Sequence, residues 1–228
     1  MIITLGSERG TPLWTAPVSG VTIELVAGNT SQVAGILGDL FFAQWPSKQK
    51  EIRTPLAFML INLGKSPVKF SLSTQMSQNQ ILWDPYVFEH NIPAEINPNV
   101  FKQTTSPISI PEGYVDTLSK WYSVKYTYQD YNLIFLRPQI CISFQNHAQR
   151  GEHWEIMAGS PIVVAGSLVV YNAKVGEHFD LPLGHMHGLI NPSKTEWTAI
   201  KETWSGHFDE KDIIRIFNPN HYVSPKTK

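Results

Sequence analysis

Two stretches decide the fold: Ser143-Phe-Gln-Asn-His147-Ala-Gln-Arg-Gly-Glu152-His-Trp154, and Gly176-Glu-His-Phe-Asp-Leu-Pro182-Leu-Gly184-His-Met-His187-Gly-Leu-Ile-Asn191. Both join short β-type segments to turns that contain Gly or Pro. Gln145 and His147 stand two residues apart at the end of an expected strand, so their side chains project from the same face. The two stretches therefore predict short strands that bring polar side chains from distant parts of the chain together.

The strand that follows the Arg150-Gly151 turn has an apolar face. Alternation places Glu152, Trp154 and Ile156 on one side of this strand and His153 on the other. A barrel interior favours Trp154 and Ile156. We therefore expect Glu152, rather than His153, to point inward.

Four side chains form a candidate metal site: Gln145, His147, Glu152 and His187. They supply two nitrogen and two oxygen donors, a set suited to Zn²⁺, Mn²⁺, Fe²⁺, Co²⁺ or Ni²⁺ with room for water or substrate. The alternative is that these groups only form hydrogen bonds across a barrel. His185 stands two residues before His187 and either supports the site, as a hydrogen-bond partner or proton shuttle, or has no part in it.

The rest of the chain is typical of an all-β protein. Its 228 residues include 16 prolines and 15 glycines, and the segments between them are short and rich in β-branched and aromatic residues. The expected strands of the second half are 121–128, 132–136, 140–144, 153–157, 162–164, 168–173, 176–181, 198–203 and 213–217. So many short strands predict a small antiparallel barrel or jelly roll.

The first half is expected to form a separate, β-sandwich-like domain over residues 1–83. Strands are expected at 20–27, 56–63 and 68–74, and the Gly64-Lys65-Ser66-Pro67 link between the last two is of the kind that closes a hairpin. Residues 33–43 fit either a strand pair or a short helix. A Pro/Asn-rich connector over 84–116 then leads to the second domain at 117–228.

Composition excludes several classes of function. A formal net charge of −1 and 16% charged residues give no basic footprint for nucleic acid. The longest apolar run, Leu56–Ile61, is too short to span a membrane, and Met1–Gly10 lacks the features of a signal peptide. The single cysteine, Cys141, excludes a disulfide framework within the chain and is expected to be buried. We therefore expect a cytoplasmic protein, or a cysteine-poor virion component.

The motifs resemble a known family. The spacing Gly176-x5-Pro182-x-Gly184-x2-His187-x3-Asn191 matches the second motif of the cupin superfamily, and Ser143 to Trp154 is similar to the first motif of type II mannose-6-phosphate isomerases. The same first motif occurs in the isomerase domain of bifunctional isomerase/GDP-mannose pyrophosphorylases. Glu202-Thr-Trp-Ser-Gly206 and Asp212-Ile-Ile-Arg215 resemble that family's closing segment. The resemblance covers roughly Lys120 to Tyr222 and implies a C-terminal cupin (jelly-roll) barrel that binds metal through Gln145, His147, Glu152 and His187.

Three positions depart from the family pattern. Gln139 replaces the usual opening glycine, Gln149 stands where the isomerases have a further histidine, and Trp204 replaces a glutamine. The first half also lacks the Gly-rich nucleotide-binding opening of a pyrophosphorylase. Only the second half can therefore be interpreted by resemblance.

The resemblance implies a metal-dependent sugar-phosphate isomerase. The metal would polarise the sugar oxygens, Glu202 or His185 would move a proton through an enediol, and Arg215 would hold the anionic end. Alternatively, Glu202 is a plain carboxylate of the barrel wall and Arg215 pairs with a neighbouring carboxylate. The competing function is a non-catalytic β-scaffold for assembly or carbohydrate attachment, such as a virion structural component. The expected partners are a sugar phosphate or carbohydrate and further copies of the chain in a homo-oligomer.

One packing prediction follows from the strand alternation. If Gln145 faces inward, then Ile140, Ile142 and Phe144 face outward. Three apolar side chains in a row are not left in water without reason. We expect the first domain or a second copy of the chain to cover them.

Overall fold

The computed structural model describes residues 1–207 and 211–221. The chain forms two compact units: the first unit comprises Met1–Pro85 and Val164–Val170, and the second comprises Tyr86–Val163 and Tyr171–Lys228. Strand β15 (Ile162–Ala165) begins in the second unit and ends in the first, which also contains β16 (Leu168–Val170). The expected domain end at residue 228 and the end of the resemblance at Tyr222 lie outside the described residues.

The first unit is a pair of antiparallel sheets packed through a common core. Its other strands are β1 (Ile2–Leu5), β2 (Leu13–Thr15), β3 (Val21–Ala27), β4 (Val33–Leu37), β5 (Leu40–Phe42), β6 (Gln49–Ile52), β7 (Ala57–Asn62), β8 (Val68–Leu72) and β9 (Ile81–Trp83), with 3₁₀ turns at Thr30–Gln32 and Gln78–Gln80. One sheet has the order β1-β8-β3-β6. In the other, β5, β4, β7, β2 and β9 pair in that order. Buried residues of both sheets, among them Ile23, Phe58 and Phe70, form one cluster, which confirms the sandwich-like prediction.

Two sequence predictions for this unit have different outcomes. Residues 33–43 form a strand pair, with Leu37 opposite Leu40 across a two-residue turn. The hairpin expected at residues 64–67 is wrong, because β7 pairs with β2 and β4 whereas β8 pairs with β1 and β3. The link instead carries the chain from one sheet to the other. The buried side chain of Asn62 stabilises this crossing by donating to the carbonyls of Leu5, Gly6 and Ser66.

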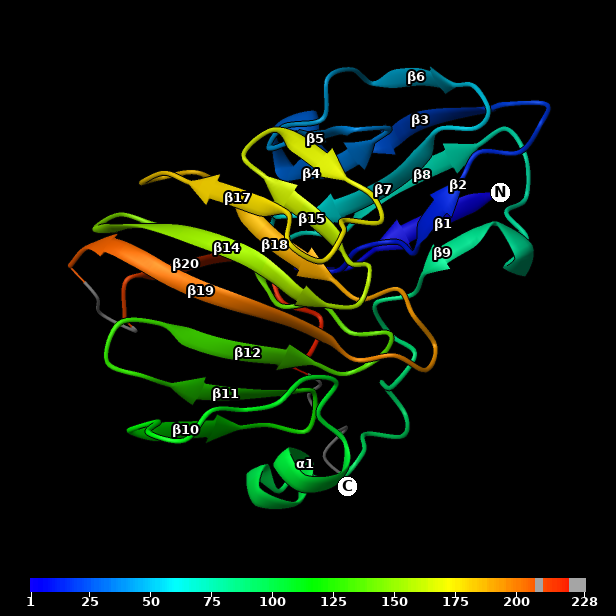
Figure 1. The fold of residues 1–228 in the computed structure, drawn as a ribbon. Helices are drawn as coiled ribbons and strands as arrows, with labels where there is room; N and C mark the ends of the chain where they lie inside the picture. The colour runs from blue at the N-terminus through cyan, green and yellow to red at the C-terminus, as the bar shows by residue number, and fades with distance from the viewer. Residues whose placement is uncertain (208–210, 222–228) are drawn as a thin grey trace, which may run out of the picture. The chain divides into compact units, whose positions relative to one another are not determined.

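A six-stranded antiparallel sheet dominates the second unit (Figure 1). Its strands, in spatial order, are β10 (Asp116–Ser119), β11 (Ser123–Thr127), β12 (Asn132–Leu136), β19 (Thr198–Gly206), β14 (Arg150–Ala158) and β17 (His178–Leu181). Helix α1 (Pro98–Thr104) was not expected from the sequence. Asn97 caps it by accepting hydrogen bonds from the backbone N–H groups of Asn99 and Val100, and Pro98 occupies its first turn. Its buried Phe101 packs on Phe135, so part of the expected connector covers one face of the sheet.

Three further strands of the second unit pair with one another: β13 (Phe144–His147), β18 (His187–Ile190) and β20 (Ile213–Phe217). Strand β13 lies between the other two, with Gln145 paired to His187 on one side and to Arg215 on the other. Strands β10 and β18 were missed in the sequence. Residues 1–207 and 211–221 contain one α-helix among twenty strands, which confirms the all-β prediction.

The outward register expected for Ile140, Ile142 and Phe144 is wrong at Ile142, which lines the interior cavity described below. The reason is local: β13 begins only at Phe144, so strict alternation does not extend back to residue 140. Ile140 and Phe144 are buried. Phe144 packs against Phe217 of β20 within the same unit, so this ring is covered without a second copy of the chain.

Candidate metal centre

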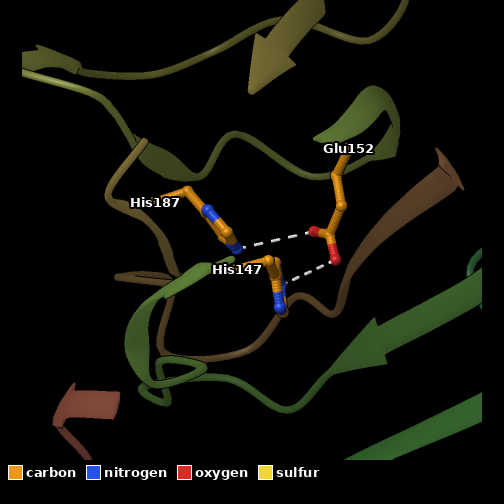
Figure 2. A group of neighbouring side chains, drawn as sticks. All are labelled: His147, Glu152 and His187. Carbon is orange, nitrogen blue, oxygen red and sulfur yellow. Dashed lines mark ion pairs between the residues drawn. The ribbon is translucent and has the colours of Figure 1, made fainter. Parts of the chain in front are cut away.

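His147, Glu152 and His187 come from three strands and meet in the interior of the second unit (Figure 2). His147 ends β13, Glu152 lies near the start of β14, and His187 begins β18. Their exposed fractions are 2%, 5% and 2%, and one potential ligand atom from each lies within 4.8 Å of the others. The structure therefore places three of the four predicted donors together, and it points Glu152 inward, as alternation along β14 predicts.

The Glu152 carboxylate is the centre of this group. Its Oε1 lies 2.9 Å from the Nε2 of His147 and accepts a hydrogen bond from the Nε of Arg150 at 3.0 Å. Its Oε2 accepts from the Nε1 of Trp154 at 3.1 Å and lies 3.5 Å from the Nε2 of His187. Both imidazoles thus present Nε2 to one carboxylate, as Figure 2 shows.

Backbone carbonyls hold the two imidazoles. The Nδ1 of His147 lies 3.1 Å from the carbonyl oxygen of Asp212, and the Nδ1 of His187 lies 3.0 Å from that of His185. A carbonyl only accepts, so each Nδ1 carries a proton, and Nε2 is the ring atom at which a metal ion can bind in place of a second proton. The Asp212 carboxylate, in turn, accepts from the backbone N–H groups of Ala148 and Gln149 and fixes the loop after β13.

A divalent cation fits this donor set. Among the described residues, the buried Nε2 of His187 has no hydrogen-bond partner, which is a costly state for a lone pair unless something binds it. Burial raises the pKa of Glu152, but the hydrogen bond with His147 and the charges of His187, His147 and Arg150 outweigh burial and bring that pKa to about 2. Burial also lowers the pKa of His187. An ionised carboxylate and a neutral imidazole are the forms that bind metal.

Gln145, the fourth predicted donor, lines the same interior cavity as Glu152. It is half-buried, and its Oε1 accepts a hydrogen bond from the hydroxyl of Ser143 at 2.6 Å. That Gln145, His147, Glu152 and His187 act together as ligands stays a prediction.

The cavity, of about 120 Å³, carries a cationic lining. Lys120, Lys125, Arg150 and Arg215 lie around it, together with the acids Glu152 and Glu202. Our sequence reasoning assigned Arg150 only to a turn, although it shares the inward parity of Glu152 along β14. Its buried guanidinium lies 3.0 Å from the Oε1 of Glu152, so it offsets the charge of that carboxylate in the metal-free protein. The same guanidinium lies 3.3 Å from the Nε2 of His147.

Glu202 lies deep in this cavity, on β19. Its Oε1 accepts from the side-chain amide of Asn132 at 2.8 Å, and its Oε2 accepts from the Nε1 of Trp154 at 3.3 Å. Burial, reinforced by the neighbouring charge of Glu152, raises the pKa of Glu202 to about 8. Trp154 thus contacts two carboxyl groups. Near neutral pH Glu152 is ionised, whereas Glu202 keeps its proton.

The remaining predicted residues lie further out. Arg215 is exposed and lines the cavity, opposite Gln145 in the strand register. His185 is exposed and is not among the residues that line the cavity, so its contribution to the site is its main-chain carbonyl. Trp204 pairs directly opposite Glu152 and is half-buried, whereas Gln149 is exposed.

Residues 111–218 match the family model described as mannose-6-phosphate isomerase, C-terminal. We call these residues the isomerase-like domain, after this similarity. The resemblance predicted from the motifs is thereby confirmed for the second half of the chain. The first half lies outside the match.

Curated relatives align with about a third of the chain. The xanthan biosynthesis protein XanB of Xanthomonas campestris pv. campestris is 32% identical over 83 residues, which are 36% of this chain and 18% of that protein. The mannose-1-phosphate guanylyltransferase of Escherichia coli K12 is 30% identical over 84 residues, 36% of this chain and 17% of that protein. The chain therefore spans less than a fifth of the length of these relatives.

Solved structures show only distant likeness. An oxalate decarboxylase from Lactobacillus farciminis, in a formate complex, is 11% identical with a TM-score of 0.37, covering 94% of this chain and 78% of that chain. The protein TT1209 from Thermus thermophilus is 18% identical with a TM-score of 0.34, covering 37% of this chain and 84% of that chain. Neither score supports an argument about chemistry.

Within the described residues, no helix has the length and apolar character needed to cross a membrane.

Proposed function

We propose that the isomerase-like domain is a metal-dependent aldose–ketose isomerase acting on a sugar phosphate. One observation carries the proposal: a buried His147–Glu152–His187 group adjoins a cavity lined by four cationic side chains. The match of residues 111–218 to the mannose-6-phosphate isomerase family supports the choice of substrate class. Mannose 6-phosphate is accordingly the first substrate to test.

The residues have distinct roles in this proposal. His147, Glu152 and His187 hold the divalent cation, with Gln145 as the fourth donor. When bound, such a cation supplies Lewis-acid polarisation of the carbonyl and hydroxyl oxygens of the sugar. Arg215, exposed at the cavity, binds the phosphate, because a guanidinium pairs bidentately with phosphate oxygens.

Glu202 is the proposed acid–base group. A carboxyl whose pKa lies near neutrality can both take and return a proton, and burial brings the pKa of Glu202 to about 8. In the reaction, the Glu202 carboxylate removes the proton from C2 of the aldose, which leaves an enediolate; the hydroxyl proton of O2 moves to O1, and Glu202 returns its proton to C1, which gives the ketose. Asn132 and Trp154 orient both oxygens for this transfer. His185 is not assigned the role, because it does not line the cavity.

The test is interconversion of mannose 6-phosphate and fructose 6-phosphate by protein loaded with Mn²⁺, Zn²⁺ or Co²⁺. We expect metal-dependent turnover that Glu202→Gln abolishes. Arg215→Gln should mainly raise KM, by about tenfold or more, since it removes a charged hydrogen-bond partner. Arg53→Gln, which removes an exposed guanidinium from the first unit, is the matched control and should leave both constants unchanged.

Metal-loaded protein that interconverts no aldose and ketose phosphate would exclude the isomerase. Metal-free protein that elutes as large assemblies would instead support the non-catalytic scaffold expected as the alternative function. Elemental analysis combined with size-exclusion chromatography separates these two outcomes.

A further inference from the structure

A second group of histidines and carboxylates lies on the opposite face of β14. Strands β14 and β17 lie side by side (Figure 1) and pair antiparallel. His153 is directly opposite Asp180, and Glu155 is directly opposite His178. Paired residues share a face of a sheet, as do residues two apart on one strand. All four side chains therefore project together, away from the face that carries Glu152. We call these four residues the β14–β17 cluster.

His153 is held as metal-binding imidazoles are held. Its Nδ1 lies 2.6 Å from the Oδ1 of Asp180. Because an ionised carboxylate only accepts hydrogen bonds, Nδ1 carries the proton, and in the neutral ring Nε2 keeps the lone pair. A carboxylate on the far nitrogen fixes the tautomer and raises the basicity of a ligating histidine.

The second imidazole faces this lone pair. The Nδ1 of His178 lies 3.2 Å from the Nε2 of His153, and the two rings stack with their planes 26° apart. Two nitrogens bound to one ion at about 2.0–2.1 Å lie about 2.9–3.3 Å apart when the angle at the ion is between octahedral and tetrahedral. In the metal-free pair, a proton on the Nδ1 of His178 can bridge to the Nε2 of His153. A cation can replace this proton without changing the distance between the two nitrogens.

Solvent ions can reach the cluster. The side chains of His153 and Asp180 are 42% and 87% exposed, and His178 is exposed as well. Glu155 stands directly opposite His178 on the same face and adds a negative charge beside the pair. Water would complete the coordination.

We propose that His153 and His178 form a second, surface site for a divalent transition metal such as Zn²⁺, Ni²⁺ or Cu²⁺. Asp180 orients His153 in this site through its contact with Nδ1. The site joins β14 to the edge strand β17, and it is separate from the interior group. It does not rest on the proposed isomerase function.

Cu²⁺ is the probe, because it binds nitrogen sites more tightly than the other first-row divalent ions and gives an EPR signal that reports nitrogen ligands. We expect His187→Ala protein, whose interior group is broken, to bind one equivalent of Cu²⁺ with two nitrogen ligands. Adding His178→Ala should remove this equivalent. Asp180→Asn should weaken binding by about tenfold, as is usual for a partner of a metal-ligating histidine. His90→Ala, which removes another exposed imidazole of the second unit, is the control and should change nothing.

If the His187→Ala protein does not fold, the wild-type chain gives the same comparison. His178→Ala should then lower the number of bound Cu²⁺ equivalents by one, while His90→Ala should not. Unchanged stoichiometry and an unchanged EPR spectrum in the His178→Ala variant would overturn the proposal in either background.

Discussion

Replacing Glu152 by glutamine in metal-free protein should destabilise the second unit by about 3 kcal/mol, because removing one partner of a buried ion pair leaves the other charge uncompensated. The carboxylate offsets the buried guanidinium of Arg150, 3.0 Å away, and pairs with His147 at 2.9 Å. Glutamine keeps the size and one oxygen for Trp154 but removes the charge. The expected loss lies at the lower end of the range of about 3–5 kcal/mol for such changes.

The assay is urea unfolding after EDTA treatment, read by hydrogen exchange in peptides from residues 144–158 so that it reports on the second unit. Glu155→Gln makes the same change of charge on the opposite face of β14 and should cost less than about 0.5 kcal/mol. Adding Arg150→Met to Glu152→Gln should recover part of the loss, because an apolar side chain then replaces the unpaired cation. If Glu152→Gln and Glu155→Gln are equally stable, the reasoning about the buried carboxylate is refuted.

Three further predictions concern the same site. His187→Ala should lower the affinity for Zn²⁺ or Mn²⁺, measured by calorimetry, by about 100-fold or more. His185→Ala should leave this affinity nearly unchanged, because alanine keeps the main-chain carbonyl that orients His187. Equal losses of affinity in the two variants would contradict these assignments. Zn²⁺ at about 100 times its Kd should raise the free energy of unfolding by about 2.7 kcal/mol, reversibly with EDTA, and no shift would count against a metal site. For Glu202, the raised pKa of about 8 means that the metal-free native state keeps a proton that the unfolded chain releases above pH 4.5. Stability relative to Glu202→Gln should therefore fall by a few kcal/mol between pH 4.5 and pH 8, as measured by melting temperatures, and a pH-independent difference would show that Glu202 is not buried as a neutral acid.

The sequence predicted the interior group because strand alternation is a local property. Trp154 and Ile156 are apolar and are expected to be buried. Because side chains alternate along a strand, Glu152 is then expected on the same buried face. The donors His147 and His187 followed from motif spacing. Arg150 was missed although it obeys the same alternation and its partner Glu152 lies two residues along the same strand, because a buried arginine is rare unless it is paired.

Long-range strand pairing limits what the sequence can predict. The Gly64–Pro67 link has the composition of a hairpin, yet β7 finds partners on both sides, and β8 joins the other sheet. The β14–β17 cluster arises in the same way, since only the register of the two strands brings His153 and His178 together. Helix α1 had a local signal, the Asn97-Pro98 pair, which the surrounding prolines obscured.

The most direct test of the account is a crystal structure of metal-loaded protein, with anomalous scattering recorded at the absorption edge of the added ion. We predict an anomalous peak about 2.0–2.3 Å from the Nε2 atoms of His147 and His187 and from one carboxylate oxygen of Glu152. A map without a peak between these three side chains, or coordinates in which they point away from one another, would contradict the account.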